Sequence, residues 1–263
     1  MPERLILKIK KRQIEILVFL YRFRYLNRIQ IQSLLGHKKF NQVILWLNDL
    51  TGGKYIKCYY SKKFASQPSI YSLGVVARKY LKNNKDIAAI QPYLLNRVWK
   101  EHQYSQTFRK HCMFAADIYL SLLSLVEKNK VKLKYFTKVD LTGMKYMVRD
   151  IPDAYFAIEG KNGLKKGYFL DILDDFPQRE TLRKRMWQYI RYYNFNYWQD
   201  NTGNPFPEII MICADNRTKN YLRGYIKYTL SRRQIAITFH LSTWAEIKTQ
   251  GIKKETLHKV EPV

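Results

Sequence analysis

The feature that most limits the fold is a change of hydrophobic periodicity near the N-terminus. Apolar residues recur with helical spacing over residues 12–24, 27–35 and 40–50, and a polar or glycine-containing break follows each segment. Two segments rich in β-forming residues come next, over 54–60 and 70–73. This order predicts three helices followed by a hairpin, which is the order of a winged helix-turn-helix.

Local signals mark the ends of these elements. Asn27 is expected to cap the second helix and Gly36 to end it. The polar tip between the two β segments would be the wing. A further helix over 74–81 would complete a domain of residues 1–83.

Net charge indicates the class of partner. The chain has 47 Lys and Arg against 21 Asp and Glu, a formal charge of +26, and residues 1–83 alone carry 17 basic and three acidic residues. With 46% hydrophobic and 15% aromatic residues the chain can bury a core. The cations must therefore lie outward, where a polyanion or salt offsets their repulsion. Double-stranded DNA is the predicted partner, and an anionic membrane surface is the weaker alternative.

Other classes of protein are not supported. The longest nearly uncharged apolar stretch, residues 114–126, is interrupted by Asp117 and is shorter than the roughly 20 residues of a membrane helix. Cys58, Cys112 and Cys213 lie far apart and form neither a CxxC motif nor a Cys/His cluster. We therefore expect a cytoplasmic protein without membrane contact, zinc finger or disulfide framework.

The rest of the chain predicts an α+β domain over residues 99–248, after a linker over 84–98 and before a charged tail over 249–263 that frays. A long helix is expected over 98–128. The elements expected after it are strands 131–136, 151–158 and 167–173, helix 178–197, strand 208–213, helix 217–230, strand 234–239 and a short helix near Trp244.

Acidic residues gather at the ends of two of these strands. If the Asn162-Gly163 turn pairs the strands, Asp153 and Asp171 lie at nearly equal distances from it and their carboxylates converge. Converging carboxylates suit Mg²⁺. The alternative is structural: Asp153 caps a turn, Asp171 pairs with an arginine, and Asp174 and Asp175 cap the following helix.

Several short motifs follow one another between residues 12 and 245: Tyr-Ser-Leu-Gly at 71–74, His111, Pro-Asp-Ala at 152–154, Phe-Leu-Asp at 169–171, then Lys184 and Tyr189. In this order they resemble the replication-relaxation family of plasmids and other mobile elements. The second half of that family is similar to the PD-(D/E)xK nuclease fold, an α/β fold with a mixed sheet, which implies metal-dependent phosphodiester chemistry.

The resemblance implies that Asp153 and Asp171 are catalytic, Mg²⁺-binding acids and that Lys184 is the catalytic cation, with Lys165 or Lys166 as alternatives. The chain departs from the pattern, however. Phe169 stands where relatives carry Glu, and Leu173 stands where the nuclease lysine is expected. We therefore expect a degenerate nuclease-like domain that binds DNA without cutting it.

The residues expected to contact DNA lie at the starts of the second and third helices and at the wing tip. They are Arg28, Lys38, Lys39, Asn41, Gln42, Lys62 and Lys63. The predicted function is sequence-directed binding of double-stranded DNA in replication, mobilisation or maintenance of a mobile element. The alternatives are a Mg²⁺-dependent endonuclease using Asp153 and Asp171, and a transcriptional regulator whose second domain dimerises or senses a ligand. Homodimerisation stays open.

Overall fold

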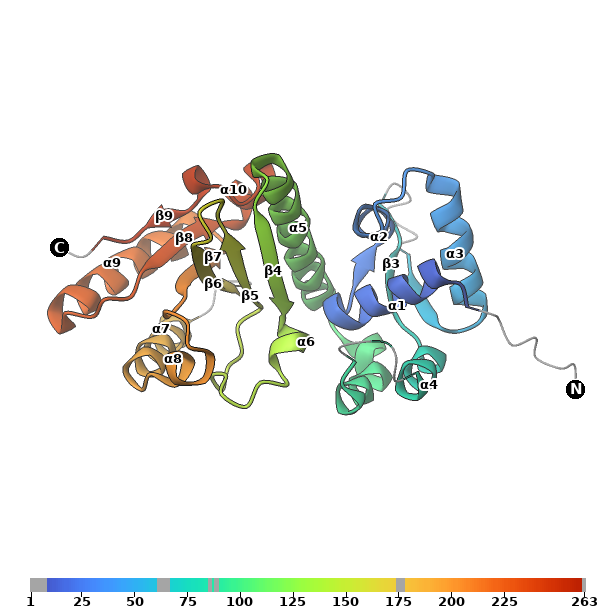
Figure 1. The fold of residues 1–263 in the computed structure, drawn as a ribbon, viewed down its shortest axis with the longest axis horizontal. Coiled ribbons are helices and arrows are strands. Elements are labelled where there is room, and N and C mark those ends of the chain that lie inside the picture. Colours follow the sequence, from blue (N-terminus) through green and yellow to red (C-terminus); the bar gives the residue numbers. More distant parts are fainter. Residues whose placement is uncertain (1–8, 61–66, 85–86, 88–89, 174–177, 262–263) are drawn as a thin grey trace, which may run out of the picture. The chain divides into compact units, whose positions relative to one another are not determined.

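Two compact units, Met1–Leu120 and Ser121–Val263, make up the chain in the computed structural model (Figure 1). The structure describes residues 9–60, 67–84, 87, 90–173 and 178–261. The protein is of mixed α+β type and its larger sheet is mixed. None of the described helices has the length and apolar character to cross a membrane.

Unit 1 begins with three helices close to their expected bounds, namely α1 (Lys11–Phe23), α2 (Arg28–Leu34) and α3 (Phe40–Gly52). Helix α1 buries Leu17 and Leu20 on one face. Asn27 caps α2, since its side-chain oxygen accepts a hydrogen bond from the amide of Gln30 at 2.9 Å. Gly36, with φ +59°, takes the left-handed conformation that ends the helix.

A three-stranded antiparallel sheet accompanies these helices, with β1 (Leu26–Asn27), β2 (Ile56–Tyr59) and β3 (Ile70–Leu73) in the order β1-β3-β2. Gly74 links β3 to α4 (Val75–Asn83). Its amide donates to the carbonyl of Tyr55 at 2.7 Å. A Cβ at this position would lie 2.3 Å from the carbonyl oxygen of Lys54, so the close approach requires glycine.

The expected linker region contributes to unit 1, because the 3-10 helix η1 (Pro92–Gln103) packs within that unit. Glu101 of η1 is 3% exposed and forms ion pairs with Arg24 at 3.1 Å and with Arg97 at 3.4 Å. The hydroxyl of Tyr25 donates to the carbonyl of Glu101. A buried carboxylate held by two guanidinium groups therefore ties η1 to the end of α1.

Helix α5 (Gln106–Asn129) runs through the division between the units. The elements that follow it are β4 (Lys132–Thr137), α6 (Lys138–Leu141), β5 (Ala154–Glu159), β6 (Lys165–Ile172), α7 (Arg179–Asn194), α8 (Tyr197–Thr202), β7 (Glu208–Cys213), α9 (Asn216–Arg233), β8 (Phe239–Thr243), α10 (Trp244–Gln250), η2 (Lys254–Thr256) and β9 (His258–Lys259). The sequence pattern did not indicate α6, α8, η2 or β9.

The six-stranded sheet of unit 2 has the order β4-β5-β6-β7-β8-β9. Strands β4, β5 and β6 are antiparallel neighbours, β6, β7 and β8 are parallel, and β9 returns antiparallel to β8. Gly163, with φ +75°, lies in the predicted turn between β5 and β6. The register pairs Ala154 with Leu170, so Asp153 and Asp171 occupy the next position on each strand.

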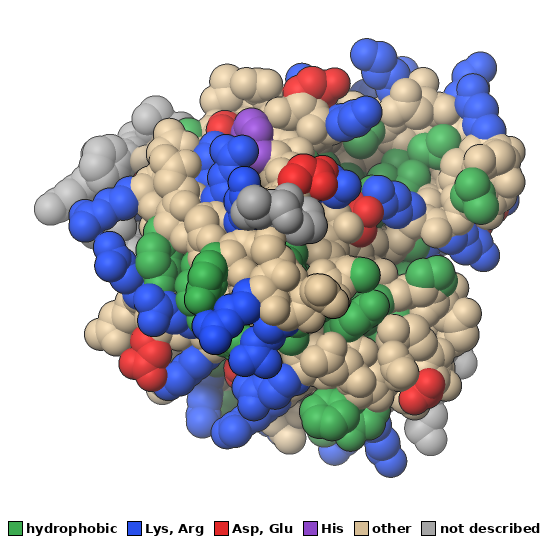
Figure 2. Space-filling model, turned by 90° about the vertical axis from the view of Figure 1, so that its left-hand side faces the viewer, with side chains coloured by type: hydrophobic (Ala, Val, Ile, Leu, Met, Phe, Trp, Pro, Cys, Tyr) green, Lys and Arg blue, Asp and Glu red, His purple; other side chains and the backbone are tan. Residues whose placement is uncertain are grey.

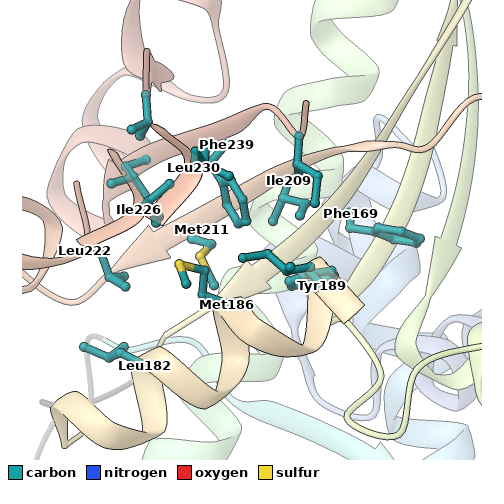
Figure 3. Packing of buried hydrophobic residues seen from close by; sticks show 14 of the residues in the cluster. Phe169, Leu182, Met186, Tyr189, Ile209, Met211, Leu222, Ile226, Leu230 and Phe239 are labelled. Atoms are coloured by element: carbon teal, nitrogen blue, oxygen red, sulfur yellow. The ribbon is translucent and has the colours of Figure 1, made fainter. Parts of the chain in front are cut away.

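Helices α7 and α9 cover one face of this sheet, and Figure 1 shows α5 and α10 on the other. Alternate residues of β6, β7 and β8 point to the α7 and α9 side, as the two-residue period of a strand requires. The core formed there (Figure 3) includes Phe169, Leu182, Met186, Tyr189, Ile209, Met211, Leu222, Ile226, Leu230 and Phe239.

The C-terminal part differs from the expectation in two places. Residues 249–261 do not fray, because β9 pairs with β8 and the buried Val260 donates its amide to the carbonyl of Phe239 at 2.9 Å. The strand expected over 234–239 begins only at Phe239. Gln234, with φ +51°, caps α9 in the left-handed conformation, so an extended strand cannot start there.

Candidate nucleic-acid interface and carboxylate cluster

Helix α3 has an outward face because its apolar residues pack on one side. Val43, Leu47 and Leu50 are at most 1% exposed. On the opposite side Asn41 is exposed and Leu45 is 55% exposed. An amide that can pair with adenine therefore lies one turn from an apolar side chain that can contact a thymine methyl group.

The residues predicted for this interface lie in different environments. Lys38 and Lys39 are exposed just before α3, as is Asn41 in its first turn, whereas Gln42 is half-buried on the flank of the helix. Sequence reasoning missed Leu45. The available signal was its spacing, four residues after Asn41 and off the buried stripe of the helix.

Aromatic contacts order the turn between α2 and α3. The guanidinium group of Arg28 lies 4.1 Å from the ring centroid of Phe40. The ring of His37 lies 5.0 Å from that of Trp46, and its Nδ1 is 3.1 Å from the carbonyl oxygen of Lys39. His37 therefore serves to pack and fix the turn, while Arg28 is half-buried at the start of α2.

The wing residues predicted to contact DNA, Lys62 and Lys63, lie outside the described residues. Strands β2 and β3 pair antiparallel, as expected for a hairpin, with Cys58 opposite Tyr71.

Asp153 lies just before β5 and is 9% exposed. One of its carboxylate oxygens accepts a hydrogen bond from the amide of Ile172 at 2.9 Å. The other accepts from Nζ of Lys138 at 3.0 Å. The side chain therefore joins β5 to the end of β6 and to the first residue of α6.

Asp171, in β6, is 3% exposed and pairs with α7. Nε of Arg185 donates to one carboxylate oxygen at 2.6 Å, and a terminal guanidinium nitrogen donates to the other. The hydroxyl of Tyr189 donates to the same carboxylate at 2.9 Å, and the carbonyl of Asp150 accepts from the remaining guanidinium nitrogen. This is the bidentate arrangement of a strong charge-assisted pair.

The cluster raises the pKa of both α7 residues. Burial opposes the charge of Arg185, but the attraction of Asp171 outweighs it and raises the pKa of the guanidinium group. Burial, reinforced by the negative charge of Asp171, raises the pKa of Tyr189 well above its ordinary value. Both groups therefore remain protonated, and Tyr189 is unsuited to act as a nucleophile.

The two carboxylates lie at the same end of neighbouring strands, and the guanidinium of Arg185 is attracted to Asp153 as well as to Asp171. Their oxygens already accept bonds from Lys138, Ile172, Arg185 and Tyr189. The arrangement does not fit Mg²⁺, which demands octahedral oxygen ligands and usually keeps several waters. Within the described ranges, no group of three or more His, Cys, Asp or Glu is placed to hold a metal ion.

Lys184 does not join the carboxylates. Its side chain is 75% exposed and pairs with Glu180 at 2.8 Å. The alternative lysines are also engaged elsewhere, Lys165 near Glu159 at 3.7 Å and Lys166 with Glu208 at 2.8 Å. The cation that reaches Asp171 is the next residue along α7, Arg185. An arginine partner for Asp171 was the structural alternative, but the sequence did not identify which arginine.

The other residues considered from the sequence, His111 and the three cysteines, have packing roles. His111 is half-buried and its ring stacks on that of Phe108, with an interplanar angle of 5°. Cys58, Cys112 and Cys213 form no disulfide bonds, and the last two are buried.

Comparison with known families decides where the chain belongs. The family model described as replication-relaxation matches residues 17–209, most of the chain. The chain belongs to the replication-relaxation family. No curated protein and no solved structure matches the chain. Membership of the family indicates a role in replication or mobile-element processes.

In this replication-relaxation protein the matched range contains both sites described above. It includes α2 and α3 as well as Asp153, Asp171 and Arg185, and it ends within β7. Helix α9 and the strands β8 and β9 lie beyond it.

Proposed function

We propose that this replication-relaxation protein binds double-stranded DNA through a winged helix-turn-helix within unit 1. The order α1, β1, α2, α3, β2, β3 and the sheet order β1-β3-β2 support this assignment. The observation that carries it is the outward face of α3, where Asn41 and Leu45 lie beside the exposed cations Lys38 and Lys39. In such a module the helix enters the major groove and flanking cations contact phosphates.

The elements of unit 2 support the proposal that it is a nuclease-like domain without nuclease activity. Its mixed sheet, in which β4, β5 and β6 are antiparallel neighbours and β7 is parallel to β6, is compatible with the PD-(D/E)xK fold that the family resemblance implies. Arg185 bonds both carboxylate oxygens of Asp171, which are the atoms that would have to bind a metal ion. We infer that the domain contributes binding or assembly, and that the chain acts in replication, mobilisation or maintenance of a mobile element.

The test of DNA binding uses the full chain and a labelled duplex. Lys38→Gln with Lys39→Gln should reduce the slope of log affinity against log salt by about 0.9 for each phosphate that a lysine neutralises, or about 1.8 for both. A matched control, Lys79→Gln with Lys82→Gln in α4, removes the same charge from exposed positions of the same unit. Equal slopes for both double variants would contradict the role of α3.

Sequence reading is tested separately from phosphate binding. A duplex selected from a random pool should lose its advantage over random DNA in Asn41→Ala, by about 1–3 kcal/mol for a good bidentate contact. Leu45→Ala should reduce the advantage by removing an apolar contact with a thymine methyl group. The Lys38→Gln and Lys39→Gln variant should weaken both duplexes alike. If Asn41→Ala and Leu45→Ala leave the preference intact, the outward face of α3 is not the reading surface.

A metal-dependent endonuclease is the second candidate, favoured by the adjacency of Asp153 and Asp171 on one face of the sheet. We expect no nicking of supercoiled plasmid in Mg²⁺ or Mn²⁺, because these oxygens are engaged by Arg185, Lys138 and Ile172. Metal-dependent nicking that disappears in both Asp153→Ala and Asp171→Ala, with the circular dichroism spectrum retained, would establish the endonuclease instead.

A further inference from the structure

The outer surfaces of α7 and α9 carry the strongest unbalanced charge among the described elements of unit 2. The two helices contain eleven lysines and arginines and one acidic residue, Glu180. Lys184, Arg185 and Lys219 pair with carboxylates. The other eight are exposed and form no ion pair with a carboxylate among the described residues; they are Arg179, Arg183, Arg191, Arg217, Arg223, Lys227, Arg232 and Arg233.

This charge faces outward because the apolar sides of both helices are used by the core. Leu182 and Met186 of α7 and Leu222 and Ile226 of α9 point toward the sheet (Figure 3). Figure 2 looks onto the end of unit 2 where α9 lies, and lysine and arginine side chains gather there among green apolar and aromatic ones.

Three of the arginines lie over aromatic rings where α7 meets α9. We call this group the arginine-aromatic seam, and it consists of Arg179, Arg183, Arg233, Trp187, Tyr221 and Tyr225. The guanidinium of Arg179 lies 4.9 Å from the ring centroid of Tyr221, that of Arg183 lies 4.9 Å from Tyr225, and that of Arg233 lies 4.6 Å from Trp187.

Hydrogen bonds between the helices hold the rings of the seam in place. Nε of Arg183 donates to the hydroxyl of Tyr221 at 2.6 Å, and the indole nitrogen of Trp187 donates to the hydroxyl of Tyr225 at 3.0 Å. Tyr221 and Tyr225 are stacked with an interplanar angle of 7°. Stacking holds each guanidinium by its face and leaves N–H groups at its edge for an anion, so less side-chain entropy is lost on binding.

We propose that the arginine-aromatic seam is a second contact with DNA, which binds the phosphate backbone of a duplex independently of α3. Guanidinium groups match phosphate oxygens in a bidentate geometry. The rings are half-buried and each has an arginine over its face, whereas a single-strand site requires open aromatic faces for stacked bases. Backbone contacts of this kind carry no sequence information, so the seam adds affinity for any duplex.

The test compares two full-length triple variants on a labelled duplex of random sequence. Arg179→Gln, Arg183→Gln and Arg233→Gln remove the seam, while Lys128→Gln, Lys130→Gln and Lys254→Gln remove the same charge from exposed positions elsewhere in unit 2. The seam variant should flatten the slope of log affinity against log salt by about 2.7, at about 0.9 for each phosphate that an arginine neutralises. The control should keep the slope of the wild type.

Two further measurements separate this site from α3 and from a purely structural role. When the seam substitutions are added to Lys38→Gln and Lys39→Gln, the slope of log affinity against log salt should fall further. The two sites are thereby tested separately, because the seam can fail this test while the role of α3 stands, and the reverse. Replacing the three arginines by lysine keeps the charge and should retain most of the slope. Equal slopes for the seam variant and its control, in a protein with unchanged melting temperature, would overturn the proposal. So would a loss of affinity confined to single-stranded oligonucleotides or to anionic vesicles.

Discussion

Removing Arg185 should destabilise the protein strongly, because its partner Asp171 is buried. The side chains of Arg185 and Asp171 are 14% and 4% exposed, so Arg185→Leu leaves a carboxylate buried without its partner. Breaking a buried ion pair on one side costs about 3–5 kcal/mol. At about 2–4 °C per kcal/mol for a chain of this size, the melting temperature should fall by roughly 6–20 °C.

The neighbouring residue provides the matched control. Lys184→Leu makes the same chemical change one position earlier on α7, where the side chain is 75% exposed, so the melting temperature should hardly change. The double variant Asp171→Leu with Arg185→Leu removes both charges. It should recover most of the stability, because a buried pair replaced by apolar residues is often neutral or stabilising.

Thermal unfolding followed by circular dichroism measures all four proteins, and chemical unfolding checks the ranking. Equal destabilisation by Arg185→Leu and Lys184→Leu would refute the burial of the pair. A double variant as unstable as Arg185→Leu alone would show that poorer packing, rather than an unpaired Asp171, causes the effect.

Three more predictions follow from the described contacts. Burial disfavours ionisation of Glu246, but hydrogen bonds from Lys219, Thr243 and Ser242 lower its pKa to about 2. The stability that this carboxylate contributes is therefore fully present above about pH 4.5 and is lost as the pH falls toward 2. In urea titrations between pH 5 and 2.5, the free energy of unfolding should decline less steeply for Glu246→Gln than for the wild type. Glu101→Ala should lower the free energy of unfolding by about 3–5 kcal/mol, because it leaves the guanidinium groups of Arg24 and Arg97 facing each other. For the same reason a fragment ending at residue 83, which lacks Glu101, should have a lower melting temperature than one ending at residue 120. Gly74→Ala should destabilise the chain, because its Cβ would lie 2.3 Å from a backbone oxygen, whereas Gly52→Ala, with open space around it, should not.

Local chemistry made much of the fold predictable. The cap of α2 needed only Asn27, whose side chain bonds the amide of Gln30. The hairpin of β5 and β6 needed only a turn that accepts a positive φ, which Gly163 supplies. Once that turn was placed, the register followed, and with it the neighbouring positions of Asp153 and Asp171.

The features that could not be predicted are those that depend on tertiary contacts. Strand β9 has two residues and no periodicity of its own, and it exists because the edge of β8 pairs with it. Lys184 and Arg185 are indistinguishable as charges in the sequence. Successive helical residues differ by about 100° in direction, so only the packing of Met186 and Tyr189 against the sheet determines that Arg185 faces Asp171.

Helix α7 uses arginine in two opposite ways, and both favour a DNA-binding role over metal chemistry. Arginine keeps its charge when buried, so Arg185 can enter the interior only with a carboxylate, and Asp171 meets that need in full. The acidic residues expected to form a negative site are therefore neutralised inside the unit, Asp171 by Arg185 and Asp153 by Lys138. Arg183, two residues before Arg185, lies over Tyr225 without a described carboxylate partner. The surface of α7 thus remains positive, which is the charge that the proposed contact with a phosphate backbone requires.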